Sequence, residues 1–447
     1  MNLRLLCFNI LKSVEGGSFI QNELKRLDGL NARDAAFTTR LVKGVIRNRL
    51  KLERRIAAAS SRSLSKIDSD TLLFALIGAY QLDEMDGVPS YAAVNETVKA
   101  MKSLKMHKTS SFVNGVLRTV SKGQPGTVDY ADEAERLSVE YSFPLWLVER
   151  WSKQYDGSRL EALLKEMNSE PLTSIFVNIN KISLDDLIAE ISLEGVKCKK
   201  NEFFDDMLTV EEGRAAYTDA FNHGCFYIQD PASRLVAKIV SLIADTAESS
   251  ILDAASAPGG KSLNLLCDGY NPVASDISYS KLIVMKENLH RMGLNENQLI
   301  ALDAEKPLPF SNRFRIVLLD APCSACGRIR RAPEIKYRLT PEDFDFLSAQ
   351  QLRLLSNLSD YIEDGGFLVY ATCSIDRIEN EDVIEKFLRD KPAFAMIDPK
   401  SFGGKLTILA EITDDEGFIR TDSLLGKMDG FFIAIMKKTT AGGSYLA

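Results

Sequence analysis

The pattern of apolar and polar residues divides the chain into three parts. In the first, apolar residues recur at the spacing of amphipathic helices, as in FTTRLVKGVIRNRL, TLLFALIGAYQL and YAAVNETVKAMKSL. This predicts an all-helical domain over residues 1–128. In the second part, the strand-like runs TSIFVNIN and CFYIQD flank a helical stretch, IAEISLEGV. That order predicts a small α+β domain over residues 129–234.

The third part, residues 235–440, alternates short apolar runs with helical stretches. The runs are SILDAAS, PVASDIS, QLIALDAE, FRIVLLDAPCS and GFLVYATCS. Each is short and apolar enough to be a strand buried on both faces of a parallel sheet. Alternation of such strands with helices predicts an open α/β sheet. FFIAIMKK predicts one further strand, at an antiparallel edge of that sheet.

Polar residues follow these predicted strands and indicate a ligand site. In open α/β sheets, ligands bind beyond the carboxyl ends of the strands. The first strand leads into Gly259 and Gly260, which let backbone amides approach a ligand at a helix N-terminus. Asp276 and Asp303 end the next two strands, and acids there can bind the hydroxyl and amino groups of a nucleoside. Each feature taken singly is also typical of an ordinary turn or helix cap.

Two cysteines end the following two strands. Cys323 follows Asp320 in the motif Asp-Ala-Pro-Cys, and Cys373 follows a threonine. A thiolate that adds to carbon 6 of cytosine makes carbon 5 nucleophilic enough to accept a methyl group. Asp320 would donate a proton to the ring, and Lys261 would lower the pKa of the attacking thiol. The motifs alone do not decide which cysteine attacks.

Cys326 forms a CxxC motif with Cys323, which in other settings binds zinc. A structural zinc site needs about four ligands, and the sequence has no second cysteine pair and no histidine partner for this motif. We therefore expect no metal.

Composition and charge narrow the class of protein. Seven scattered cysteines and the absence of any apolar run of about 18 residues indicate a cytoplasmic protein with no membrane span. The net charge is −7, but residues 1–130 contain 20 Lys and Arg against 12 Asp and Glu, which leaves them at +8 and the remainder at −15. This asymmetry favours contact between the N-terminal domain and a polyanion. A solvated helical surface would give the same count.

Several motifs resemble those of a known family. DAASAPGGKS, DAPCSACGRIRRAPEIKYR and VYATCSIDRIENEDV are similar to motifs of RNA cytosine-5 methyltransferases of the NOL1/NOP2/Sun family. RDAAFTTRLVKGVIRNR and VNGVLR resemble the NusB-like RNA-binding domain. The resemblance covers essentially the whole chain. It implies an all-α NusB-like N-terminal domain, a small α+β (RRM-like) middle domain and a C-terminal Rossmann-like class I methyltransferase domain.

The resemblance also implies a cofactor, S-adenosylmethionine, and roles for particular residues. Cys373 would be the nucleophile and Cys323 would assist release of the methylated base. The implied cofactor residues are Ala255, Ser256, Ala257, Pro258, Gly259, Gly260, Lys261, Asp276, Asp303 and Asp320. The implied substrate is 16S ribosomal RNA, methylated at carbon 5 of cytosine 967, and we expect a monomer.

A basic segment follows the first of the two cysteines. Its members are Arg328, Arg330 and Arg331, followed by Lys336 and Arg338. We expect the three arginines to contact phosphates around a base flipped out of its stack, although a solvated basic loop would have the same composition. Two other functions stay open at this point: the same reaction on transfer RNA, and a non-catalytic RNA-binding assembly factor.

Overall fold

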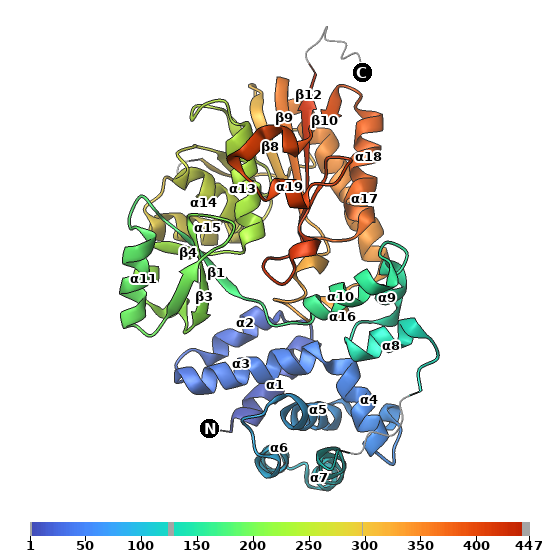
Figure 1. The fold of residues 1–447 in the computed structure, drawn as a ribbon. Helices are drawn as coiled ribbons and strands as arrows, with labels where there is room; N and C mark the ends of the chain where they lie inside the picture. The colour runs from blue at the N-terminus through green and yellow to red at the C-terminus, as the bar shows by residue number, and fades with distance from the viewer. Residues whose placement is uncertain (1, 124–128, 297, 440–447) are drawn as a thin grey trace. The chain divides into compact units, whose positions relative to one another are not determined.

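The described chain folds into two compact units (Figure 1). The structure, a computed structural model, describes residues 2–123, 129–296 and 298–439. The helical unit contains the residues up to Ser169 together with Ile329–Leu339. The sheet unit contains Glu170–Arg328 and the residues from Thr340 onward. None of the described helices combines the length and the apolar character needed to cross a membrane.

The described residues of the helical unit form helices and connecting turns, which confirms the prediction of an all-helical N-terminal domain. Its helices are α1 (Leu3–Glu15), α2 (Ile20–Leu24), α3 (Ala32–Arg47), α4 (Arg49–Ala59), α5 (Ser69–Glu84), α6 (Ser90–Ser103), α7 (His107–Ser121), α8 (Glu133–Glu140), α9 (Leu145–Trp151), α10 (Gly157–Met167) and α16 (Ile335–Arg338). Side chains of Asn2, Asn31 and Asp68 cap α1, α3 and α5 by accepting backbone N–H groups of the first turn. Helix α5 is the most buried, and its apolar residues pack against the surrounding helices.

The helical unit extends beyond the predicted domain end at residue 128, which itself lies outside the described residues. Helices α8, α9 and α10 belong to it rather than to the small sheet, because the turn after α8 is fastened to α4. The backbone N–H of Lys51 donates to the Ser142 hydroxyl at 3.0 Å.

The inserted segment Ile329–Leu339 is also fastened to this unit. The Lys336 ammonium is fully buried and donates to the carbonyl of Arg47 at 2.9 Å and to Asn168 Oδ1 at 3.0 Å. The Tyr337 hydroxyl donates to the Ser142 carbonyl at 2.8 Å.

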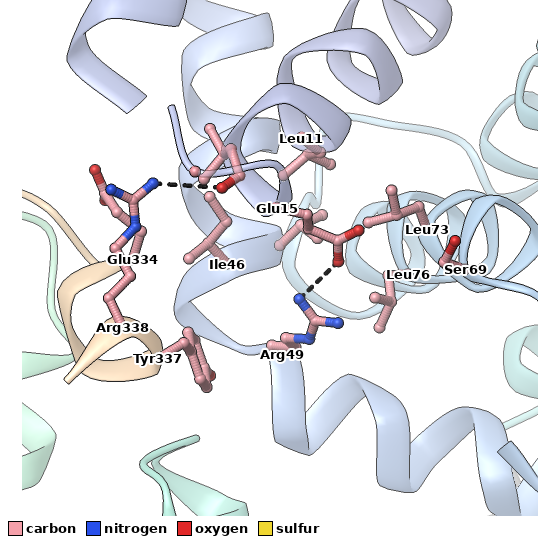
Figure 2. Close-up of a pocket in the computed structure, with 13 residues that line it drawn as sticks. Leu11, Glu15, Ile46, Arg49, Ser69, Leu73, Leu76, Glu334, Tyr337 and Arg338 are labelled. Carbon is pink, nitrogen blue, oxygen red and sulfur yellow. Dashed lines mark hydrogen bonds and ion pairs between the residues drawn. The ribbon is translucent and has the colours of Figure 1, made fainter. Parts of the chain in front are cut away.

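A cavity of about 640 Å³ lies within the helical unit (Figure 2). Apolar side chains of α1, α3 and α5 line it, among them Leu11, Ile46 and Leu73. At its rim Arg49 pairs with Glu15 at 2.7 Å, and Arg338 of α16 donates to the carbonyl of Val14 at 3.3 Å. The hydrogen bond from Arg338 fastens α16 to α1.

A small antiparallel sheet begins the sheet unit. Its strands are β1 (Thr173–Val177), β2 (Lys197–Lys200), β3 (Met207–Glu212) and β4 (Phe226–Ile228), in the order β2-β3-β1-β4. Helices α11 (Leu184–Leu193) and α12 (Asp219–Asn222) pack on it. The predicted strands around TSIFVNIN and CFYIQD and the helix between them are present; β2 and β3 were not predicted.

The large sheet of this unit contains all the predicted α/β strands. Its strands are β5 (Ile251–Asp253), β6 (Val273–Asp276), β7 (Leu299–Ala301), β8 (Phe314–Asp320), β9 (Ile362–Thr372), β10 (Phe394–Met396), β11 (Ile419–Arg420) and β12 (Phe432–Lys438). Its helices are α13 (Pro231–Ile243), α14 (Gly260–Cys267), α15 (Tyr279–Met292), α17 (Pro341–Leu358), α18 (Glu381–Asp390) and α19 (Leu409–Ile412). Apolar clusters cover both faces, one with α13 to α15 and one with α17 and α18.

The order of the strands places the site. The sheet runs β10-β12-β9-β8-β5-β6-β7, and β7, β6, β5, β8 and β9 are parallel. The chain moves from β5 outward to β7 and then returns to the other side of β5, so the strand order reverses between β5 and β8. A crevice forms at such a reversal, at the carboxyl ends of the strands. Strand β12 is antiparallel as predicted, but it lies inside the sheet because β10 pairs with its other side.

Candidate active site

The loop after β5 approaches the pocket closely because it contains two glycines. Gly259 has φ of +104° and precedes α14, and a Cβ atom there would lie 2.6 Å from Cγ of Met285. A Cβ atom on Gly260 would lie 3.1 Å from Nε2 of Gln229. Glycine is therefore required at position 259 both by backbone conformation and by space.

Acidic side chains stand at the ends of the strands beside this loop. Asp276, at the end of β6, accepts the backbone N–H groups of Ala257 at 3.1 Å and Ser278 at 2.8 Å. Asp303 follows β7, and its hydrogen bond from the Glu305 backbone, with Lys306 beside it, lowers the pKa of its carboxyl. Both residues also line the pocket described next.

These residues line a pocket of about 290 Å³. Its lining residues are Ala254, Ala255, Ala257, Asp276, Ile277, Lys281, Leu302, Asp303, Ala304, Glu305, Asp320, Ala321, Pro322, Cys323, Gln350, Leu354 and Cys373. The structure thus brings together the predicted Ala255, Ala257, Asp276, Asp303 and Asp320. The other predicted loop residues, Ser256, Pro258, Gly259, Gly260 and Lys261, support the loop without lining the pocket.

Sequence reasoning missed some of the pocket. Ile277 directly follows the acid of β6, is 71% exposed and lines the pocket. Its position after Asp276 was the available signal. Gln350 and Leu354 come from α17, and nothing in the sequence connects that helix with the strand ends.

The two cysteines meet at the end of the pocket. Strands β8 and β9 are parallel neighbours with Asp320 paired to Ala371, so the loops that follow them lie side by side. The Sγ atoms of Cys323 and Cys373 are 3.3 Å apart. The hydrogen bond between the two thiols lowers the pKa of Cys373, and Arg328 and Lys261 lower it further against the effect of burial. The same hydrogen bond, together with burial, raises the pKa of Cys323.

Lys261 and Asp320 form an ion pair beside the thiols. The Lys261 ammonium is nearly buried and also lies 5.5 Å from the centre of the Phe431 ring. Lys261 donates a hydrogen bond to Asp320 and so holds this carboxylate in place beside the pocket.

The third cysteine points away from this pair. Cys326 is fully buried, and its Sγ lies 3.3 Å from the Ser374 hydroxyl and accepts the Ile375 backbone N–H at 3.3 Å. Within the part of the chain that the structure describes, no three histidine, cysteine or acidic side chains are grouped as a metal site would need.

The arginines that were expected to contact RNA lie in different environments. Arg328 is exposed, 3.6 Å from Asp429. Arg330 is only 2% exposed, which argues against the predicted contact with RNA. The physical reason is that the chain enters the helical unit at Ile329, where the following residues become part of the packed interior. Arg331 is half-buried, and the expectation that it contacts phosphate stays a prediction.

Family models match three successive stretches of the chain. The NusB family model matches residues 1–122, a ferredoxin-like domain model of RsmF/B-like methyltransferases matches 143–216, and the 16S rRNA methyltransferase RsmB/F model matches 240–437. A probable ribosomal RNA small subunit methyltransferase B of Bacillus subtilis (strain 168) is 32% identical, over 87% of this chain and 90% of the relative. The chain belongs to the 16S rRNA methyltransferase RsmB/F family. A further member of similar name, from Shewanella oneidensis, is 31% identical over 98% of this chain and 100% of its own.

Solved structures show the same fold as this RsmB/F chain. A methyltransferase homologue from Pyrococcus horikoshii is 25% identical with a TM-score of 0.56, over 69% of this chain and 100% of its own. NSun6 from Pyrococcus horikoshii, solved with SFG, is 20% identical with a TM-score of 0.57, over 66% of this chain and 97% of its own.

The chain is an S-adenosylmethionine-dependent methyltransferase, and its pocket suits that cofactor. Asp276, Asp303 and Asp320 line the pocket and would supply negative charge for a cationic sulfonium and acceptors for ribose hydroxyls. The alanines of the β5 loop leave room beside them.

Proposed function

We propose that this chain methylates carbon 5 of a cytosine in 16S ribosomal RNA, at position 967, with Cys373 as the covalent nucleophile. The observation that carries the proposal is the pair of thiols, 3.3 Å apart, in the wall of the cofactor pocket. A methyltransferase acting on an oxygen or an exocyclic nitrogen needs no thiol, because those atoms are already nucleophilic.

The reaction begins at Cys373. Its Sγ forms a bond to carbon 6 of the cytosine while the Lys261–Asp320 pair gives a proton to the ring nitrogen, which leaves carbon 5 electron-rich. The bound cofactor supplies the electrophilic methyl group that carbon 5 takes up. The ring nitrogen then returns its proton to the Lys261–Asp320 pair, and loss of the proton from carbon 5 to solvent restores the ring double bond and expels Cys373 as a thiolate.

Cys323 acts at the release step in this scheme. It contacts Cys373 through sulfur and lines the same pocket, so it lies beside the base while the adduct exists. Removing it should leave adduct formation intact and slow the breakdown of the adduct.

The RNA would be held partly by the helical unit. That unit includes most of the basic N-terminal stretch, and its first 122 residues match the NusB family. Arg328 is exposed five residues after Cys323 and supplies a phosphate contact near the flipped base.

The test uses purified full-length protein with labelled S-adenosylmethionine and either 16S ribosomal RNA or transfer RNA. We expect label in 16S RNA, mapped by bisulfite resistance to cytosine 967. Cys373→Ala should abolish label and covalent capture, and Cys323→Ala should accumulate a protein–RNA adduct visible as a retarded gel band. Cys198→Ala, on β2 of the small sheet, is the matched control and should behave as wild type.

Three outcomes would contradict the proposal. Label found only in transfer RNA would show that transfer RNA, and not 16S ribosomal RNA, is the substrate. A covalent RNA adduct formed by Cys373→Ala but not by Cys323→Ala would reverse the roles proposed for the two cysteines. Absence of label in both RNAs would contradict the proposal that the chain methylates cytosine.

A further inference from the structure

A buried carboxylate joins the two loops that follow the reacting cysteines. Glu379, at the end of the short 3-10 helix η6 (Arg377–Glu379), is fully buried. It accepts the backbone N–H of Ser324 at 2.8 Å and the Ser324 hydroxyl at 2.5 Å. It also accepts the Ser374 hydroxyl at 2.5 Å. Ser324 directly follows Cys323 and Ser374 directly follows Cys373, so one side chain bridges the two loops.

A fourth donor extends this bridge to α17. Nε2 of Gln351 donates to Glu379 at 3.1 Å and to the carbonyl of Pro322 at 2.9 Å. Pro322 is the residue before Cys323, so the loop is held on both sides of that cysteine. Such a network tolerates little movement, because each buried polar atom that lost its partner would cost about 1–3 kcal/mol.

The hydrogen bonds also indicate the charge state of Glu379. The Ser324 hydroxyl accepts the backbone N–H of Cys326 at 3.4 Å, and the Ser374 hydroxyl accepts that of Asp376 at 3.2 Å. The Ser324 hydroxyl also lies 3.3 Å from the Ser374 hydroxyl, but each hydroxyl is closer to the carboxylate, at 2.5 Å, so the shorter hydrogen bonds are those to Glu379. Burial raises the pKa of Glu379, but four donors converge on it, and only the ionised form accepts from all four.

The charges around the two thiols differ. Glu379 and burial add to the hydrogen bond that raises the pKa of Cys323. The charged groups that act on Cys373 are Arg328 and Lys261, which lower its pKa, and Asp320, which raises it. The charged carboxylate that acts on Cys323 is negative, whereas two positive charges and one negative charge act on Cys373.

We propose that Glu379 is a positioning residue that sets the separation of the two thiols and keeps the transferable proton on Cys323. It leaves Cys373 as the thiolate and Cys323 as its hydrogen-bond donor. The catalytic role of Glu379 rests on the proposed function. Its effect on the two thiols can be measured in the protein without RNA.

The experiment measures thiol reactivity in the full chain. Protein is treated briefly with iodoacetamide across a pH series, and alkylation at Cys323 and Cys373 is quantified by peptide mass spectrometry. In the wild type Cys373 should react first, at the lower pH. In Glu379→Gln the preference for Cys373 should fall by about tenfold, the change that corresponds to one pKa unit.

Glu381→Gln is the matched control. Glu381 is a buried carboxylate on the adjoining helix α18, but it pairs with Arg420 rather than with the cysteine loops. The control should keep the wild-type preference. If Glu379→Gln does not fold, Ser374→Ala is the alternative variant. It removes one hydrogen bond to Glu379 but keeps the negative charge of Glu379, and it should reduce the preference for alkylation at Cys373 by a smaller factor.

An unchanged preference in Glu379→Gln, with a melting temperature equal to that of the wild type, would overturn the inference. An equal loss of preference in Glu381→Gln would do the same, because it would reflect general loosening. The RNA assay is separate: a shifted preference with no RNA methylation by the wild type would defeat the proposed function and leave the assignment of Glu379 standing.

Discussion

Arg234 offers the sharpest prediction about what joins the small sheet to the large one. It lies on α13, its side chain is fully buried, and its guanidinium pairs with Asp206 at 2.5 Å and with Asp268 at 2.7 Å. Asp206 precedes β3, and Asp268 follows α14. The guanidinium also lies 4.7 Å from the centre of the Phe176 ring on β1.

Replacing Arg234 with methionine keeps most of the buried volume and leaves two carboxylates without their shared partner. Breaking a buried ion pair in this way costs about 3–5 kcal/mol. Lys238 remains 3.0 Å from Asp206, and the Ser241 hydroxyl still donates to Asp268 at 3.0 Å. The loss should therefore be near the lower end, about 3 kcal/mol, which lowers the melting temperature of a unit of this size by roughly 6–12 °C.

The stability that the Arg234–Asp206 pair contributes should depend on pH. Burial alone would raise the pKa of Asp206, but Arg234 and Lys238 bring it below its ordinary value. A depressed carboxyl pKa contributes stability that is present above the unfolded pKa, about 3.9, and is lost as the pH falls through the folded pKa. Calorimetry should show a constant difference between wild type and Arg234→Met from pH 8 to about 5, and a smaller one below about 4.

The control is Arg234→Lys, which keeps the positive charge but not the bidentate geometry. Its stability should lie between those of the wild type and Arg234→Met. An Arg234→Met protein as stable as the wild type at pH 7, or a difference that grows on acidification, would refute the reasoning.

Three further predictions concern the site. Gly259→Ala should lower stability by about 1–2 kcal/mol through its left-handed backbone and weaken cofactor binding by crowding Met285, as denaturant unfolding and calorimetric titration would show. Lys261→Met should reduce kcat by about 10²–10⁴-fold and move alkylation of Cys373 to higher pH, because Lys261 lowers the pKa of that thiol; an unmoved alkylation profile would contradict this. Arg328→Ala should weaken RNA binding and its salt dependence without changing the melting temperature, whereas Arg330→Met should lower the melting temperature.

Much of the fold follows from local patterns. Strand β8, for example, contains the apolar run Ile316–Leu319, whose short length and β-branched residues suit a strand buried on both faces. Strand β2 was missed because KCKK has three lysines and no apolar alternation; it exists only because β3 pairs with it at the edge of the small sheet. The burial of Arg330 and Lys336 was equally unpredictable, since their composition is that of a solvated loop.

The sequence alone determined that the acids and cysteines would gather, because parallel strands bring their carboxyl ends to one edge of a sheet. It could not rank the two cysteines by physical chemistry, since each is a thiol after a strand. The opposite pKa shifts of the two thiols depend on contacts between segments far apart in the chain: the hydrogen bond between the two sulfurs, Lys261 and Arg328 near Cys373, and Glu379 near Cys323. Electrostatic effects depend on separation and burial, and only the tertiary structure sets those.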